Sequence, residues 1–366
     1  MNMKGKRFII AGGGTGGHIF PAIAIANAIK KAAPNSEFLF VGAKGKMEME
    51  KVPLAGYKIE GLTIAGFNRS SLIKNVGLPV KLIQSFFQVA SILKKFKPDA
   101  IIGVGGYSSF PVLRYAQTKG IPTFIHEANS FAGKTNIMLG KKAVKIFTAT
   151  DGMEMFFDKK KIIVSGNPVR NAIAQMAVNR SEAIAKFKLS ANKKTVLVVG
   201  GSLGAKSINE AIEKHIDFFD KHDLQLIWQT GKPYFERAKN SCEGMSNVYV
   251  SDFIAQMENA YAAADLVISR SGAMAISELC IVAKPVIFVP FPHAAEDHQK
   301  ANAMKLVKKD AAIIVEDKNV MEDLMNKVKI LIDDTQLQEK MKANIKKLSV
   351  LNADEIVAKE IINCLN

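Results

Sequence analysis

The chain has 366 residues, of which 48% are hydrophobic and 23% are charged, as in ordinary globular proteins. This length predicts two domains of roughly 150 to 200 residues each. The three widely spaced cysteines exclude a disulfide framework and a paired metal spacing, and they favour a reducing cytoplasm. The basic and apolar start runs into glycines without a cleavage site, which argues against a signal peptide, and the glycines and Pro21 argue against a membrane span.

The excess of positive charge is confined to the first half of the chain. The net charge is +16, from 50 basic and 34 acidic residues. Residues 1–170 hold 25 basic and 9 acidic residues, whereas residues 171–366 hold 25 of each. We therefore expect a basic domain that faces an anionic partner, joined to a neutral domain.

Short apolar runs alternate with helical patterns along the whole chain. In the first half, buried strands are predicted over residues 7–12, 37–42, 99–105, 122–127 and 144–149. After a polar joint, strands are predicted over residues 195–201, 224–229, 247–252, 264–270 and 284–290. Two such series predict two doubly wound α/β domains with parallel sheets, a shared cleft as the ligand site, and a helical C-terminal tail.

The first predicted strand leads into the glycine loop GGGTGGH, residues 12–18. Gly12, Gly14 and Gly17 match the fingerprint G-x-G-x-x-G of dinucleotide-binding proteins. The match is weak, because the second predicted strand ends in residues 41–44, VGAK, without the acid that would bind a ribose. His18 begins the next helix, where the helix dipole favours a neutral imidazole. A general-base role and a packing role for His18 are about equally compatible with this pattern.

Two more polar loops follow strands in the first half. GVGGYSSFP (103–111) is a second glycine loop, in which Tyr107 and Ser108 lie where a ligand can touch them. HEAN (126–129) places polar side chains at the end of a third strand. Solvation explains any one of these loops, but three at the ends of parallel strands predict a binding site.

The second half carries its own set of loops. GGSLGAKS (200–207) directs backbone N–H groups and the Ser202 hydroxyl to a helix N-terminus, as in a phosphate cradle, although the P-loop spacing is absent. RSGAMAISE (270–278) places Glu278 where it either reaches a ribose diol or faces solvent. The segment 290–303 has two histidines without zinc spacing, and no D-x-D pattern is present, so we expect no metal and no cofactor.

The motifs together resemble one family, in the same order and over essentially the whole chain. They are GGGTGGH, GVGGYSSFP, HEAN, GNPVR, GGSLGA, DFIAQM, RSGAMAISE and the ending H-Q-x-x-N-A. The family is the MurG family, the UDP-N-acetylglucosamine:undecaprenyl-diphosphate-muramoyl-pentapeptide N-acetylglucosaminyltransferases of peptidoglycan synthesis. The resemblance implies the GT-B fold, with an acceptor- and membrane-binding Rossmann-like domain (1–170), a UDP-sugar-binding one (171–345) and a C-terminal helix (346–366) packed back towards the first.

The resemblance also implies the roles of individual residues. His18 is the expected general base, with Tyr107 and Glu127 as alternatives. The implied donor-binding residues are Thr15, Gly16, Gly17, Asn129, Arg170, Ser202, Ile254, Ala273, Met274, Ala275, Ile276, Ser277, Glu278 and Gln299. The expected acceptor-binding residues are Gly13, Gly14, Gly105, Gly106, Tyr107, Ser108 and His126. The chain departs from the usual family pattern at Ala128 and around His298, which leaves the contact at His298 open.

The implied reaction is an inverting transfer of N-acetylglucosamine from UDP-N-acetylglucosamine to the 4-hydroxyl of undecaprenyl-diphosphate-N-acetylmuramoyl-pentapeptide, from lipid I to lipid II. It implies a peripheral protein on the cytoplasmic face of the cell membrane, without a nucleic-acid partner. The alternatives are a GT-B lipid glycosyltransferase with a diacylglycerol acceptor, a UDP-sugar epimerase and a non-enzymatic basic membrane-binding module. The last alternative leaves the polar loops of the second half unexplained.

Residues 68–97 predict a membrane contact. They contain six basic residues, no acidic residue and more apolar residues than one core-facing stripe requires. About half of these apolar positions fit packing on the sheet. Residues 131–147 add more lysines and no acid. We expect an apolar patch with a positive rim that docks on the anionic inner-membrane surface, made of Lys74, Lys81, Ile83, Phe86, Phe87, Lys141 and Lys142.

Overall fold

The computed structural model describes residues 5–66 and 75–365 and divides the chain into two units. The first unit comprises Met1–Arg170 and Asn352–Asn366, and the second comprises Asn171–Leu351. The second unit thus extends beyond the expected residue 345, because Ile345 and Leu348 pack in its core.

The first unit is built on a parallel sheet with seven strands in its described residues, in the order β3-β2-β1-β4-β5-β6-β7. The strands are β1 (Arg7–Ala11), β2 (Glu37–Ala43), β3 (Lys58–Leu62), β4 (Ala100–Gly103), β5 (Thr123–Glu127), β6 (Lys145–Thr148) and β7 (Ile162–Val164). Every residue of β4 and β5 is buried, as expected for parallel strands covered on both faces.

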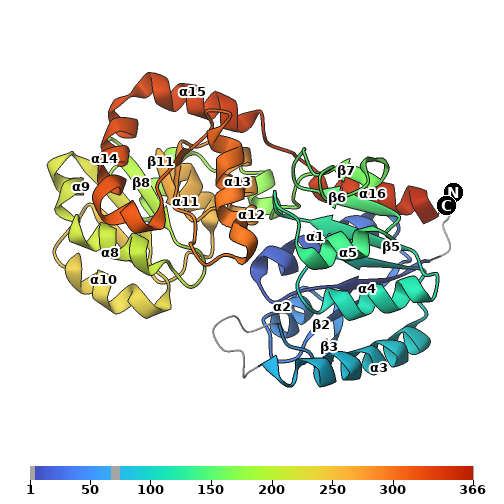
Figure 1. Ribbon diagram of the computed structural model, residues 1–366. Helices are drawn as coiled ribbons and strands as arrows, with labels where there is room; N and C mark the ends of the chain where they lie inside the picture. The colour runs from blue at the N-terminus through green and yellow to red at the C-terminus, as the bar shows by residue number, and fades with distance from the viewer. Residues whose placement is uncertain (1–4, 67–74, 366) are drawn as a thin grey trace. The chain divides into compact units, whose positions relative to one another are not determined.

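Helices cover both faces of this sheet (Figure 1). They are α1 (Gly16–Ala32), α2 (Glu48–Leu54), α3 (Leu78–Phe96), α4 (Ser109–Thr118), α5 (Lys134–Gly140) and α16 (Ala353–Leu365), with a 3₁₀ turn, η2 (Lys159–Lys161). Ile25 and Ile29 of α1 share one apolar core with Val357 and Ile361 of α16. A separate core holds the inner faces of α3, α4 and α5. The C-terminal helix is therefore a structural part of the first unit.

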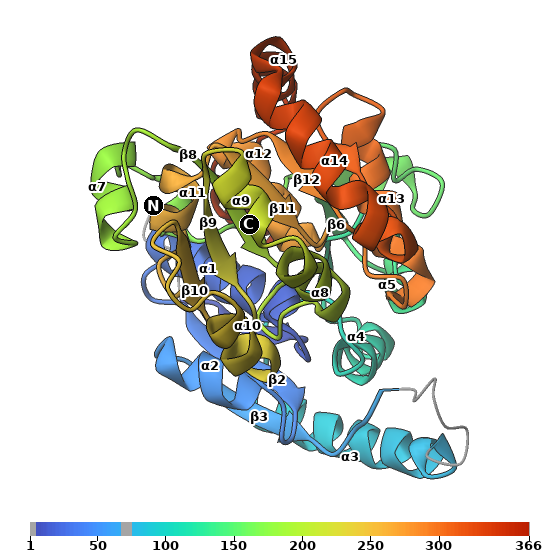
Figure 2. The same ribbon diagram turned by 90° about the vertical axis from the view of Figure 1, so that its left-hand side faces the viewer.

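The second unit has a parallel sheet of six strands in the order β10-β9-β8-β11-β12-β13. The strands are β8 (Lys194–Val199), β9 (Leu224–Gln229), β10 (Val248–Ser251), β11 (Leu266–Ser269), β12 (Val286–Phe288) and β13 (Ile313–Ile314). The helices are α6 (Asn171–Ala174), α7 (Arg180–Lys186), α8 (Lys206–Lys214), α9 (Asp217–Lys221), α10 (Phe235–Ser241), α11 (Met257–Ala263), α12 (Ala273–Val282), α13 (His298–Val307), α14 (Val320–Asp333) and α15 (Thr335–Lys346), with 3₁₀ turns η3 (Lys232–Tyr234), η4 (Ala295–Asp297) and η5 (Asp317–Asn319). One core contains residues of α8, α10 and α14, and another contains residues of α7, α11, α12 and α13. These helices are labelled in Figure 2.

All ten strands predicted from the sequence are confirmed, and so are the two doubly wound α/β units. The strands β3, β7 and β13 were not predicted. They lie at sheet edges, and two of them have only two or three residues. An edge strand has a neighbour on one side only, so its sequence needs no long apolar run.

Both sheets have one place where the strand order reverses, between β1 and β4 and between β8 and β11. Ala11 pairs with Gly103 at the first place, and Val199 pairs with Ser269 at the second. Open α/β sheets bind their ligands at such switch points, beyond the carboxyl ends of the strands. The glycine loops that the sequence singled out begin at these four strand ends.

Candidate active site

The glycine loop after β1 is tied down by its own main-chain groups. Gly12 N–H donates to a β2 carbonyl at 3.1 Å, and Gly13 N–H donates to Gly105 O at 3.3 Å. Gly14 N–H donates to Glu48 Oε2 at 2.8 Å. These three donors point into the protein, so the N–H groups open to an anion are those at the start of α1.

Glu48 is a site residue that the sequence analysis missed. Its side chain is 1% exposed, and Oε1 accepts a second hydrogen bond, from Ala43 N–H at 3.0 Å. A Cβ on Gly13 would lie 2.4 Å from the Glu48 carboxyl carbon. This packing explains the glycine at 13, whereas Gly14 has a φ of +89°, which residues with a side chain rarely adopt. The acceptor contacts of both glycines stay predictions. The signal in the sequence was an acid in the first turn of the helix after β2, rather than at the strand end.

His18 lies in the first turn of α1 with its ring across the glycine loop. Nδ1 is 3.1 Å from Gly13 O and 3.5 Å from Thr15 Oγ1. A carbonyl oxygen only accepts, so the neutral ring carries its proton on Nδ1 and its lone pair on Nε2. A Cβ on Gly105 would lie 2.8 Å from Nε2. Gly105 is buried, and its lack of a side chain leaves room for this basic atom. Its predicted contact with the acceptor stays a prediction.

Tyr107 packs against the same loop, 3.9 Å from the position that a Cβ on Gly14 would take. Its hydroxyl is buried and has no hydrogen-bond partner among the described residues. Burial, and after it the charge of Glu48, raises the pKa of the Tyr107 hydroxyl. The hydroxyl therefore keeps its proton at neutral pH, which suits a hydrogen-bond donor to a ligand better than a general base.

Glu127 organises the loop that follows β5. Its Oε1 accepts from Asn129 N–H at 3.0 Å and from Asn129 Nδ2 at 3.4 Å. Its Oε2 accepts from Gly133 N–H at 3.1 Å and from Asn136 Nδ2 at 2.8 Å. A carboxylate held by four donors is a weaker candidate for the base than His18, whose Nε2 carries a lone pair.

His126 and Ser108 are both buried, and their direct acceptor contacts stay predictions. The side chain of His126 is fully buried, with Nε2 3.4 Å from Gly166 O. Burial lowers the pKa of His126 to about 4, against the opposing effect of that hydrogen bond and with a further lowering by His18. Ser108 is also buried, whereas Gly106 is half-buried and accepts a hydrogen bond from the Ser109 hydroxyl at 2.8 Å.

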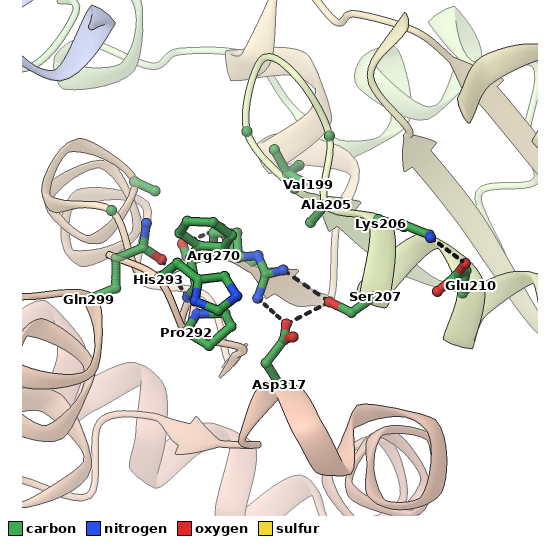
Figure 3. A pocket seen from close by; sticks show the side chains of 17 residues that line it. Val199, Ala205, Lys206, Ser207, Glu210, Arg270, Pro292, His293, Gln299 and Asp317 are labelled. Atoms are coloured by element: carbon green, nitrogen blue, oxygen red, sulfur yellow. Dashed lines mark hydrogen bonds and ion pairs between the residues drawn. The ribbon is translucent and has the colours of Figure 1, made fainter. Parts of the chain in front are cut away.

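In the second unit, the switch point opens into a cavity of about 690 Å³ (Figure 3). The N-terminal ends of α8, α12 and α13 contribute Ser207, Ala275 and Gln299 to its lining. None of these three helices has an acidic residue in its first turn. Helix N-termini combine unpaired N–H groups with the positive end of the helix dipole, so this cavity suits an anion such as a diphosphate.

Arg270, at the end of β11, is a fixed part of the cavity wall (Figure 3). It forms an ion pair with Asp317 of η5, which also accepts a hydrogen bond from the Ser207 hydroxyl. Its Nη2 donates to Ser207 Oγ at 3.0 Å, and its Nη1 donates to two carbonyls after β12 at 3.0 and 3.1 Å. The Phe291 ring lies 5.6 Å from the guanidinium carbon. Arg270 and Asp317 were not among the predicted site residues.

Of the predicted donor-binding residues, Ala275 and Gln299 line this cavity. Gln299 Oε1 accepts a hydrogen bond from Phe291 N–H at 3.0 Å. The NH₂ group of Gln299 points away from Phe291 and is the donor of this side chain. Ser202 is exposed on the loop between β8 and α8 but is not among the lining residues.

Other predicted donor residues lie behind the lining. Ile254 and Ile276 are buried in the core, and Ile254 N–H donates to Gln229 Oε1 at 2.9 Å. Glu278 is 6% exposed, and its Oε2 accepts from the Tyr261 hydroxyl at 3.1 Å. Glu278 follows Ala275 by three positions, so both lie on the same face of α12.

The remaining predicted donor residues are partly accessible. Ala273, Met274 and Ser277 are half-buried in the first turns of α12, where Ser277 Oγ donates to Ala273 O at 3.0 Å. In the first unit, Thr15 is exposed, and Gly16 and Gly17, the first two residues of α1, are half-buried. Arg170 is half-buried just before the second unit begins.

Some residues of the predicted membrane patch are exposed on the outer face of α3. Val80, Ile83 and Phe87 are exposed, with 74% of Phe87 accessible, and Lys81 is exposed beside them. Phe86 is instead half-buried against Phe110, with ring centroids 6.2 Å apart, which corrects its place in the patch. None of the described helices, α3 included, is both long and apolar enough to cross a membrane.

Two of the lysines of the predicted patch lie away from the outer face of α3. Lys141 and Lys142 are exposed, but they lead into β6, at the amino edge of the sheet. The helices run back from the carboxyl edge to the amino edge, so the first turns of α3 with Lys81 lie at the other end of the layer. Lys74 lies outside the described residues.

Comparisons with known proteins identify relatives over the whole chain. The glycosyltransferase family 28 N-terminal domain matches residues 8–148, and the glycosyltransferase family 28 C-terminal domain matches residues 195–356. Two relatives are named UDP-N-acetylglucosamine--N-acetylmuramyl-(pentapeptide) pyrophosphoryl-undecaprenol N-acetylglucosamine transferase. The one from Parabacteroides distasonis is 49% identical over 100% of both chains, and the one from Flavobacterium psychrophilum is 50% identical over 98% of both. The crystal structure of Acinetobacter baumannii MurG has a TM-score of 0.78 and 28% identity, and covers 98% of this chain and 99% of that chain.

The ion pair of Arg270 predicts a change in stability. In D317N, the buried guanidinium loses its counter-charge, so the free energy of unfolding of the second unit should fall by about 2 to 4 kcal/mol. Trp228, the single tryptophan, is buried in that unit, and its fluorescence during urea unfolding measures the change. D323N, at an exposed position of α14, is the matched control. Equal stability of the two variants would contradict the structural role of the pair.

Proposed function

The chain belongs to glycosyltransferase family 28, and we propose that it transfers N-acetylglucosamine from UDP-N-acetylglucosamine to pyrophosphoryl-undecaprenol-linked N-acetylmuramyl-pentapeptide. It is a UDP-sugar-dependent glycosyltransferase of the lipid I to lipid II step of peptidoglycan synthesis. The observation within this chain that carries the proposal is the cavity of the second unit, which is lined by the N-termini of three helices without an acidic residue in their first turns.

The donor diphosphate is assigned to this cavity. The N–H groups at the starts of α8 and α12 donate to its oxygens, and the Ser202 hydroxyl lies on the loop that leads into α8. Gln299 offers its NH₂ group to a sugar or phosphate oxygen. We assign the ribose diol to Glu278, because Tyr261 orients its carboxylate and Ala275 on the same helix face lines the cavity.

The acceptor is assigned to the first unit. Its diphosphate suits the basic charge of this half of the chain and the open N–H groups at the start of α1. The buried Tyr107 hydroxyl, which has no partner among the described residues, donates to the acceptor. Arg170 and Asn129 remain assigned to the donor, as the resemblance implies.

His18 is assigned as the general base. The acceptor 4-hydroxyl attacks the anomeric carbon of the donor, and its proton passes to Nε2 of the imidazole. The new C–O bond forms as the bond between that carbon and the diphosphate breaks, and the electron pair leaves with UDP, which inverts the anomeric centre. The helix N-termini of the second unit stabilise the charge that develops on the leaving diphosphate.

The central experiment separates the substrate classes. Radiolabelled N-acetylglucosamine from the UDP-sugar should appear in the lipid fraction when a polyprenyl-pyrophosphoryl-N-acetylmuramyl-pentapeptide is present, and UDP should be released in equal amount. Transfer to diacylglycerol instead would identify a different lipid glycosyltransferase. Conversion of the UDP-sugar to its epimer without an acceptor would identify an epimerase.

We also propose that the first unit docks peripherally on the cytoplasmic face of the membrane through the outer face of α3. The exposed side chains of Val80, Ile83 and Phe87 supply apolar contact, and Lys81 supplies charge. This docking would bring the unit to a lipid-borne acceptor.

No metal ion is assigned a role, and chelation with EDTA should leave the transfer activity intact.

Replacement of His18 should affect turnover rather than donor binding. In H18A the loss of the base should lower kcat by about 10² to 10⁴-fold, while the dissociation constant of UDP from the second unit stays unchanged. Steady-state kinetics and calorimetric titration with UDP measure the two quantities. H222A, at an exposed histidine that follows α9, is the control. Retained kcat with weakened UDP binding would remove His18 from the role of base.

Replacement of Glu278 should affect the donor. In E278A the loss of two hydrogen bonds from a carboxylate should raise the donor KM on the order of 10- to 1,000-fold, with a smaller change in kcat at saturating donor. E322A, at an exposed position of α14 in the same unit, should leave the donor KM unchanged. A donor KM in E278A equal to that of E322A would exclude the ribose contact.

Vesicle binding should depend on the first turns of α3. K81E should reduce partition onto anionic vesicles by about 5- to 30-fold, because each basic residue near such a surface contributes about 1 kcal/mol. K95E, in the last turn of the same helix, is the matched control, and added salt should weaken binding in both. F87S should weaken binding further. Equal binding to neutral and anionic vesicles, or an equal effect of K81E and K95E, would refute this docking face.

A further inference from the structure

One peptide group of the glycine loop joins two ionisable side chains. The carbonyl of Gly13 is 3.1 Å from His18 Nδ1, and the N–H of Gly14 donates to Glu48 Oε2 at 2.8 Å. This C=O and this N–H belong to the same planar unit, because the bond between Gly13 and Gly14 lies between them. A continuous chain of hydrogen bonds therefore runs from the Glu48 carboxylate through one peptide to the His18 imidazole.

We propose that Glu48 is a positioning residue that controls the basicity of His18 through the Gly13–Gly14 peptide. The carboxylate polarises the peptide and makes Gly13 O a stronger acceptor for the Nδ1 proton. It thereby holds the tautomer with a lone pair on Nε2 and stabilises the imidazolium that forms when Nε2 takes up the acceptor proton. This inference rests on the proposed function, in which His18 is the base.

The position of His18 creates the need for such a partner. His18 lies in the first turn of a helix of 17 residues, and no acidic side chain is present in that turn. The positive end of the helix dipole there disfavours an imidazolium and so weakens the base. A buried carboxylate connected to Nδ1 by hydrogen bonds acts in the opposite direction and restores the basicity of Nε2.

The groups named below, on neighbouring elements within residues 5–66 and 75–365, do not supply this charge. From the second glycine loop, Tyr107 faces the same loop with a raised pKa, and from β5, His126 has a pKa lowered to about 4, so both are neutral at neutral pH. From α16, Asp354 and Glu355 pack along α1 near its far end, where Glu355 pairs with Lys31 at 2.9 Å. Glu50 and Lys51, a residue pair of α2, bind each other at 2.8 Å on the surface.

The local sequence is built around the position of Glu48. A Cβ on Gly13 would lie 2.4 Å from its carboxyl carbon, and a Cβ on Gly42 would lie 2.5 Å from its Cγ. Both glycines thus provide room for the carboxylate beneath the loop. The second carboxylate oxygen accepts from Ala43 N–H at 3.0 Å, which fixes the side chain to the end of β2 and leaves Oε2 for Gly14.

The test compares E48Q with E50Q, the same change on the same helix at an exposed position. Glutamine keeps the size of the side chain and removes its charge. E48Q should lower kcat by about 3- to 30-fold and leave the donor KM within about 2-fold of the wild-type value. The acidic limb of the kcat–pH profile should move to lower pH by about 0.5 to 1 unit, because the imidazolium is less stabilised. E50Q should change none of these quantities.

A double-mutant cycle decides whether Glu48 acts through His18. E48Q should cause no further loss of kcat in an H18A background, because the group on which it acts is gone. If E48Q does not fold, E48D takes its place in the cycle, because the shorter side chain withdraws the carboxylate from Gly14. Circular dichroism checks the folding of each variant, and UDP titration checks the second unit.

Three outcomes separate this inference from the proposed function. An equal loss from E48Q with and without His18 would overturn it, and so would an acidic limb that does not move. In both cases the assignment of His18 stands if H18A itself has lost turnover. Full turnover in H18A would overturn the assignment of the base, and the inference with it.

Discussion

In a parallel sheet covered by helices on both faces, a ligand reaches the backbone at the carboxyl edge, where the strand order reverses. Both units of this chain obey that constraint, and their glycine loops lie there. The two units differ in what fills the place. In the first, the side chain of Glu48 occupies the space beneath the loop and accepts from Gly14 N–H of the loop and from Ala43 N–H of β2. In the second, the place is a cavity of about 690 Å³. The same fold therefore supplies a rigid support for a side chain in one unit and a binding pocket in the other.

Charge is handled differently in the two units as well. The second half of the chain has equal numbers of acidic and basic residues, and Arg270 in the cavity wall is matched by Asp317. Helix N-termini whose backbone dipoles are fixed in direction face this cavity, and Lys206 in its lining is paired with Glu210. The excess of basic residues lies in the first half, where the proposed partners are a lipid diphosphate and an anionic surface.

The sequence predicted what depends on neighbours along the chain. Central strands are continuous apolar runs, and glycine loops are visible as strings of residues, so both were found. Glu48 and Asp317 were missed because their partners are remote, at separations of 34 residues from Gly14 and 47 residues from Arg270. The exposure of Phe86 was also misjudged, since it is set by Phe110 on the adjacent helix. A single sequence does not show which residues face each other across a loop.

The return of the chain to the first unit after Leu351 has a consequence for how the protein is made. Helix α16 covers Ile25 and Ile29 of α1 with Val357 and Ile361, which are synthesised after the whole of the second unit. The second unit is continuous in sequence, so all of its residues leave the ribosome before α16 does. The first unit is thus completed only after the second, and its apolar face stays uncovered until α16 is synthesised. A fragment that stops at Arg170 would keep that face exposed and be prone to aggregate.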